Sequence, residues 1–137
     1  FIGSPQMNFV DAQCVVEGAK ASLKFDNYSI ELPEAKAKKL IDGGYAGKTV
    51  IMGIRPEDIY DGAEELAKFA DSVVETDVTG YELLGAEVLL YYTLGGANMT
   101  ARVDSDTPAR YGDHIRLALD TSKIHVFDKD SELTITN

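Results

Sequence analysis

Apolar residues recur at every second position along much of this chain, and this alternation limits the folds that it can adopt. Leu23 and Phe25 alternate with polar neighbours, and Met99, Ala101 and Val103 do the same farther along. A strand buried on one face requires a period of two, whereas an amphipathic helix requires a period near 3.6. The sequence therefore predicts a protein built mostly of β-strands.

Turn residues divide the alternating segments into hairpins. Asn27 and Tyr28 are expected at the first turn, and Gly95 with Gly96 forms a pair that accepts the positive φ angles of a tight hairpin. Gly53 lies inside a strand segment and offers one face no side chain, which indicates a bulge or a close backbone approach. The expected strands are residues 22–26, 29–32, 49–54, 87–94, 98–104, 114–120, 124–126 and 133–135.

Two short helices are expected between the strands. The first covers Glu34–Ile41, directly after Pro33, and two glycines end it. The second covers Asp61–Ala70, with Asp61 as the N-cap and Leu66 and Ala67 facing inward. Many short strands without a βαβ rhythm favour a closed or nearly closed barrel. The predicted fold class is therefore all-β with short helical insertions, in a single domain of 137 residues.

Charge and length exclude several classes of partner. The chain has 23 acidic and 13 basic side chains, so its net charge of −10 repels the phosphate backbone of nucleic acids. Its apolar runs are far shorter than the ~20 residues that a membrane-spanning helix needs, so no direct membrane insertion is expected. The single cysteine, Cys14, cannot form an internal disulfide, which fits a reducing compartment such as the cytoplasm.

The sequence contains partial motifs but no catalytic constellation. Residues 43–49 end in Gly-Lys-Thr like a phosphate-binding loop, but only three residues separate the key glycines, and the segment leads from a helix into a strand. His114 and His125 lack the spacing of a zinc site. The acidic run from Asp128 to Glu132 lacks the glycine of a calcium loop. We therefore expect no catalytic residue, cofactor or metal in this chain.

Four segments carry a resemblance to a known family. They are Phe1–Phe9 (FIGSPQMNF), Gly53–Ile59 (GIRPEDI), Leu83–Glu87 (LLGAE) and His125–Asp128 (HVFD). In this order they resemble the C-terminal regulatory domain of the maltose/multiple-sugar ATPase subunits of bacterial ABC importers. The resemblance implies an OB-fold-like barrel arrangement, the transport-associated OB (TOBE) module.

The same resemblance implies what the longer parent protein does. Residues 1–137 would be the C-terminal regulatory and dimerisation domain of a sugar-transporting ATPase, with the nucleotide-binding domain absent. ATP and Mg would bind to that missing domain, and this piece would not be an enzyme. The implied partners are a second copy in a homodimer, the membrane permease subunits through the parent chain and, in some relatives, a phosphotransferase-system regulator. The implied location is the cytoplasm, at the inner face of the cell membrane.

Five residues of the matched segments are candidate interface or regulatory residues. Arg55 and Glu57 flank a proline that fixes the backbone, so they either face a partner or form a local ion pair. Phe127 points away from its buried neighbour and lies near His125, which suits a dimer contact or core packing. Phe9 is expected to pack against the core or against a neighbouring domain.

A small oxyanion-binding barrel, as in related transport ATPases, is the alternative function. Such a site needs converging amides, hydroxyls and preferably basic groups. The excess of acidic residues argues against it.

Overall fold

The structure of the protein is a computed structural model, and it describes residues 6–137. Residues 1–5 of the FIGSPQMNF segment lie outside the described residues. The strands are β1 (Asn8–Glu17), β2 (Lys20–Phe25), β3 (Tyr28–Glu31), β4 (Thr49–Ile54), β5 (Ile59–Tyr60), β6 (Val73–Asp77), β7 (Gly80–Leu84), β8 (Glu87–Leu94), β9 (Ala97–Asp104), β10 (His114–Leu119), β11 (His125–Asp128) and β12 (Thr134–Thr136). The helices are α1 (Glu34–Asp42) and α2 (Ala63–Lys68), with short 3-10 turns η1 (Pro56–Asp58), η2 (Ala70–Ser72) and η3 (Thr121–Lys123).

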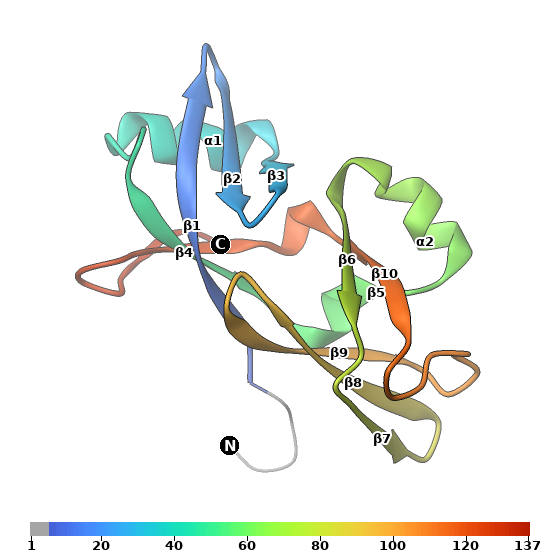
Figure 1. Cartoon of the computed structure of the whole chain (residues 1–137). Helices are drawn as coiled ribbons and strands as arrows, with labels where there is room; N and C mark the ends of the chain where they lie inside the picture. Colours follow the sequence, from blue (N-terminus) through green and yellow to red (C-terminus); the bar gives the residue numbers. More distant parts are fainter. Residues whose placement is uncertain (1–5) are drawn as a thin grey trace.

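The strands form three antiparallel sheets (Figure 1). A six-stranded sheet has the order β12-β11-β4-β1-β2-β3, and two three-stranded sheets have the orders β5-β10-β6 and β7-β8-β9. The predicted all-β class with short helical insertions is confirmed. The prediction omitted β1, β5, β6 and β7, although β1 is the longest strand and lies near the middle of its sheet.

The last strands of the chain return to the first sheet. β11 pairs with β4 on the side opposite β1, and β12 adds the outer edge. In Figure 1 the red C-terminal segment runs beside β4, and β4 separates it from blue β1. Two segments that are far apart in the sequence are therefore neighbours across β4, and this arrangement positions the candidate site.

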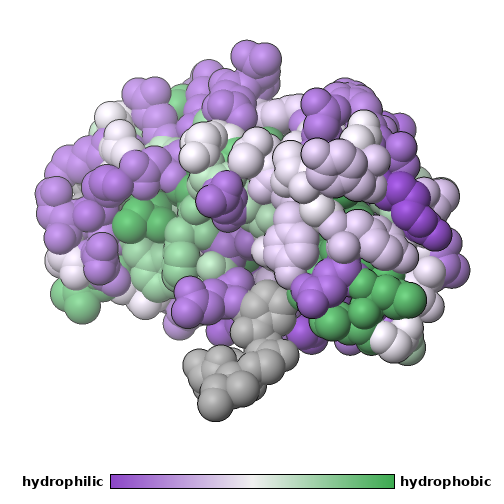
Figure 2. All heavy atoms as spheres, turned by 60° about the horizontal axis from the view of Figure 1, so that its bottom comes forward, coloured by the Kyte–Doolittle hydropathy of each residue, from purple (hydrophilic) through white to green (hydrophobic). Residues whose placement is uncertain are grey.

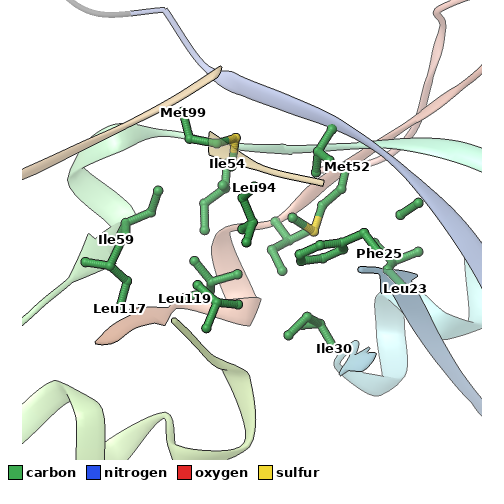
Figure 3. Close-up of a cluster of buried hydrophobic side chains, with 14 of the residues drawn as sticks. Leu23, Phe25, Ile30, Met52, Ile54, Ile59, Leu94, Met99, Leu117 and Leu119 are labelled. Atoms are coloured by element: carbon green, nitrogen blue, oxygen red, sulfur yellow. The ribbon is translucent and has the colours of Figure 1, made fainter. Parts of the chain in front are cut away.

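One apolar core is shared by the three sheets. Leu23 of β2, Met52 of β4, Leu94 of β8 and Leu117 of β10 are buried in the same cluster (Figure 3). Each fully buried leucine or methionine contributes roughly 1.5–3 kcal/mol relative to an exposed position. The sheets thus form one packing unit rather than separate modules.

Two polar side chains, one buried and one exposed, link the six-stranded sheet to the β7-β8-β9 sheet. The buried Asn8 side chain of β1 donates to the Thr100 carbonyl of β9 (2.8 Å) and accepts from the Thr100 N–H (2.7 Å). The Asp26 carboxylate accepts from the backbone N–H of Gly95 (2.7 Å) and so links two hairpin turns. Asp26 has a φ of 51°, and the first turn comprises Asp26 and Asn27 rather than the predicted residues 27 and 28.

The helix predictions had different outcomes. α1 is confirmed, and it packs against β2 and β12. The capping prediction for the second helix was wrong, because Gly62 is the N-cap and the Asp61 carboxylate accepts from the hydroxyl of Thr107. Ala67 is exposed, so the inward orientation predicted for it was also wrong, whereas Leu66 is half-buried and lies near Ile115 of β10. Leu133, predicted to lie in a strand, precedes β12 and is exposed.

Candidate functional site

Strand pairing brings the matched segments together on the outer face of the six-stranded sheet. Gly53 of β4 pairs with Phe9 of β1 on one side and with His125 of β11 on the other. In the next row of the same face, Ile51 pairs with Asp11 and with Phe127, and all these alternate with buried positions. Residues predicted from distant parts of the sequence therefore share one surface.

Gly53 makes room for the aromatic side chains of this surface. A β-carbon at Gly53 would lie 2.6 Å from Met7 Sδ and 3.0 Å from Phe127 Cε2. Above the glycine, the rings of Phe9 and Phe127 meet edge to face, with centroids 5.7 Å apart. The bulge or close backbone approach predicted at Gly53 was wrong, because the pairing of β4 with β1 and β11 continues without a bulge and the space above the glycine is taken by side chains.

The aromatic pair borders a groove that is open to solvent. The groove has a volume of about 340 Å³, and Phe9 is 49% exposed beside it. Figure 2 shows apolar surface in two areas of the face that lies at the bottom of Figure 1, one toward β11 and β12 and the other toward β7. We call the lining residues the aromatic groove: Phe9, Asp11, Ile51, Phe127 and Glu132.

One end of the aromatic groove is basic. Arg55 Nη1 donates to His125 Nε2 (3.1 Å), and His125 Nδ1 lies 3.3 Å from Asn137 Oδ1. Because a guanidinium can only donate, this arrangement requires His125 to carry its proton on Nδ1 and to donate it to Asn137. The His125 ring also stacks on Phe127, with an interplanar angle of 19°. Arg55 therefore approaches the aromatic groove through His125.

The other end of the aromatic groove is acidic. The Asp11 carboxylate forms an ion pair with the Lys129 ammonium (2.7 Å). The exposed Glu132 takes part in none of the ion pairs found within residues 6–137. The nearby Asp128 accepts hydrogen bonds from the backbone N–H of Ser131 and from the hydroxyl of Tyr45. Led by the Ser131 N–H, these bonds lower the pKa of Asp128 to about 2.

Four of the predicted interface residues meet at this surface, and the fifth does not. Phe9, Arg55, His125 and Phe127 are joined by the contacts described above. Glu57 lies in η1 and borders a separate groove, together with Tyr60 and several carboxylates. Within the described part of the chain Arg55 forms no ion pair with Glu57, so the local ion pair is wrong and the contact with His125 replaces it.

The other motifs form no site in the described residues. Residues 43–48 lead from α1 into β4 as a turn, with the Lys48 ammonium 5.8 Å from the centre of the Tyr45 ring. His114 bridges Asp77 and Glu75, one on each ring nitrogen. No group of three or more potential metal ligands occurs among residues 6–137. No helix of that span is long and apolar enough to cross a membrane.

Sequence reasoning missed three residues that shape the aromatic groove. Ile51 could have been found, because it lies two residues before Gly53 and so shares its face. Asp11 and Glu132 carried no such signal. Their place in the groove depends on the pairing of β11 with β4, which the local sequence pattern does not specify.

Two family models match the chain. The model of the MalK OB fold domain matches residues 3–59, and the model of the TOBE domain matches residues 52–127.

Three relatives match nearly the whole chain. The oligosaccharides import ATP-binding protein MsmX of Bacillus subtilis is 36% identical over 98% of this chain and 36% of its own length. The multiple sugar-binding transport ATP-binding protein MsmK of Streptococcus mutans is 37% identical over 98% of this chain and 35% of its own length. The trehalose/maltose import ATP-binding protein MalK of Thermococcus litoralis is 35% identical over 94% of this chain and 34% of its own length. The chain thus spans about a third of these relatives.

A solved structure shares the fold. The molybdate-bound cytoplasmic protein ModG matches with a TM-score of 0.61 and 14% identity, over 91% of this chain and 96% of its own.

Proposed function

Because the chain belongs to the TOBE domain family, we propose that it is the regulatory and dimerisation domain of the ATP-binding subunit of a bacterial carbohydrate ABC importer. The resemblance to sugar-importer ATP-binding subunits is confirmed by relatives that match nearly the whole chain. The parent protein would hydrolyse ATP in its other domain, with ATP and Mg bound there. It would lie in the cytoplasm and contact the membrane permease subunits.

One observation carries the regulatory and dimerisation role. The aromatic groove gathers an exposed phenylalanine, a second aromatic ring and an arginine on one sheet face. Surfaces that combine exposed aromatic residues with arginine are typical of protein contacts, and such residues supply most of the binding energy. In this proposal the groove receives a protein rather than a substrate.

The tethered domain would act by raising an effective concentration. Two ATP-binding subunits must separate and rejoin during each cycle, and a second contact between their linked domains keeps them close while they are apart. A phosphotransferase-system regulator bound to the same domain could arrest the cycle by holding it in one state. The domain itself then needs no catalytic group.

A chimera tests this function. The part of Bacillus subtilis MsmX that matches this chain is replaced by residues 1–137, and growth on imported oligosaccharides is measured in cells that lack native MsmX. We expect the chimera to support growth, because the chain aligns with MsmX over 98% of its length. The variant Phe9→Ala in the chimera should reduce growth, because it removes the exposed side chain of the groove.

The control variant for the chimera is Leu83→Ala, which removes an exposed apolar side chain from β7, away from the groove. It should leave growth unchanged. A chimera that accumulates to the level of MsmX but supports no growth would contradict the proposed function.

Oxyanion binding is the second candidate, supported by the fold shared with a molybdate-binding protein. The grooves of this chain argue against it. The aromatic groove carries Asp11 and Glu132, and the groove beside Glu57 is lined by further carboxylates. We expect no heat of binding when molybdate or tungstate is titrated into the chain in a calorimeter. Tight binding would favour this second function.

A further inference from the structure

A second groove lies apart from the aromatic groove, between the β2–β3 hairpin and the segment that links α2 to β6 (Figure 1). Its volume of about 480 Å³ lies within the range of small-molecule sites. On the hairpin side, Ser22 of β2 pairs with Glu31 of β3, and Ser29 lies on the same face two residues before Glu31. We call the groove the polar groove and define it by six of its lining residues: Ser22, Ser29, Glu31, Lys68, Phe69 and Asp71.

Both walls of the polar groove are fixed by hydrogen bonds to the β5-β10-β6 sheet. The backbone N–H of Glu75 in β6 donates to the hydroxyl of Tyr28 in β3 (2.9 Å), which holds this edge strand in place. The hydroxyl of buried Ser72 in η2 donates to the Leu119 carbonyl of β10 (2.6 Å). The polar groove is therefore formed before any ligand binds.

The charged groups of the polar groove are available to a ligand. Glu31, Asp71 and Lys68 take part in none of the ion pairs found among residues 6–137. The carboxylates can only accept hydrogen bonds and the ammonium can only donate them, whereas the serine hydroxyls do both. A ligand with several hydroxyl groups satisfies all three kinds of group, because each of its hydroxyls both donates and accepts.

Phe69 adds an apolar surface to this polar lining. Its ring stacks on the Tyr60 ring, with centroids 6.0 Å apart and an interplanar angle of 16°, so its orientation is fixed. The Lys68 ammonium lies 5.2 Å from the centre of the Phe69 ring. A saccharide has hydroxyls around the edge of its ring and C–H groups on its faces, so it needs polar partners beside an apolar one. The polar groove supplies both.

We propose that the polar groove binds an uncharged saccharide, whose hydroxyls bond to Glu31, Asp71 and Lys68 and whose C–H groups contact Phe69. Two carboxylates against one ammonium, in a chain of net charge −10, disfavour an anionic ligand such as a sugar phosphate. This site goes beyond the proposed function and does not depend on dimerisation.

The position of the polar groove in the fold supports the same class of ligand. β2 and β3 belong to the segment that matches the OB fold domain, residues 3–59. The face of the second and third strands is where OB folds bind oligosaccharides and oligonucleotides. The negative charge of this chain disfavours the oligonucleotide and leaves the saccharide.

A nuclear magnetic resonance titration of residues 1–137 tests the site. Maltose, trehalose and raffinose are added separately, and the shifts of the amide signals give both the dissociation constant and the location. We expect at least one saccharide to move the signals of Ser22, Ser29 and Asp71, while those of Phe9 and Phe127 in the aromatic groove stay in place. Glucose 6-phosphate, an anion, and spermidine, a cation without hydroxyls, should bind more weakly by about tenfold.

Two variants and a matched control locate the binding groups. Glu31→Gln and Asp71→Asn keep the size of the side chain but remove a charged acceptor, so each should raise the dissociation constant of the saccharide by about fivefold. Glu17→Gln removes the same charge from the exposed end of β1 and should leave the constant unchanged. Urea unfolding shows whether each variant remains folded.

Each other outcome identifies what is wrong. If none of the three saccharides moves these signals at high millimolar concentration, the site is overturned. If glucose 6-phosphate or spermidine binds more tightly than every saccharide, the class of ligand is wrong. If the shifts gather elsewhere, or if Glu17→Gln weakens binding as much as the groove variants, the location is wrong. The chimera experiment is independent of these results, so the proposed function is tested separately.

Discussion

The hydroxyl of Tyr92 should destabilise this protein, so its removal should raise stability. Tyr92 is only 1% exposed, and its hydroxyl has no hydrogen-bond partner within residues 6–137. A buried polar group without a partner costs about 1–3 kcal/mol. The void left by one oxygen atom costs far less, at about 24 cal/mol per Å³. We expect Tyr92→Phe to raise the free energy of unfolding by about 1–2 kcal/mol.

The neighbouring tyrosine on β8 gives a matched control. The hydroxyl of Tyr91 points to the other face and donates to Glu82 (2.8 Å) in an exposed position, so Tyr91→Phe should change stability by less than about 0.5 kcal/mol. Urea unfolding followed by circular dichroism measures both variants. In a thermal melt, Tyr92→Phe should raise Tm by about 3–8 °C. A loss of more than about 0.5 kcal/mol in Tyr92→Phe would show that the hydroxyl is satisfied and would refute this reasoning.

Three further predictions concern single residues. The Ser131 N–H is the main cause that lowers the pKa of Asp128 from 3.8 to about 2. The ionised Asp128 carboxylate therefore stabilises the fold at pH values above about 3.8, and this contribution is lost as the pH falls toward 2. Asp128→Asn should therefore flatten the pH dependence of urea unfolding between about pH 4 and pH 2, and an unchanged slope would contradict this. Cys14 is fully buried and its pKa is raised by burial, so a thiol reagent should label it only after urea is added; rapid labelling of the native protein would be unexpected. Gly95→Ala should lower the free energy of unfolding, measured in a thermal melt, by about 2–4 kcal/mol, because the φ of Gly95 is +60° and its β-carbon would lie 2.6 Å from a side chain of β1. Gly96 has open space around it, so Gly96→Ala should lower the free energy of unfolding by only about 1–2 kcal/mol.

Local signals predicted several elements of the fold. The helix at α1 follows Pro33 and ends at glycines, so its limits depend on nearby residues. The hairpin of β8 and β9 was predicted for the same reason, since Gly95 and Gly96 adopt the positive φ angles of the turn. β1 was not predicted, because its inward positions are occupied by Asn8 and small side chains rather than by a strong apolar row.

Distant contacts account for what the local sequence could not predict. Asp61 has the sequence position of an N-cap, yet its carboxylate binds Thr107, 46 residues away. The candidate site depends on the same kind of contact, because His125 reaches Arg55 only when β11 pairs with β4. Phe9 and Phe127 were candidate interface residues in the sequence, but their meeting above Gly53 required the structure.

The return of β11 and β12 to β4 has a consequence for how such domains can be recombined. The two family models overlap at residues 52–59, which suggests a natural place to exchange one half between relatives. That junction begins inside β4, which has β1 on one side and β11 on the other. A hybrid joined there would keep β1 and most of β4 from one relative but pair β4 with β11 of the other, so evolution and engineering alike should transfer the whole unit.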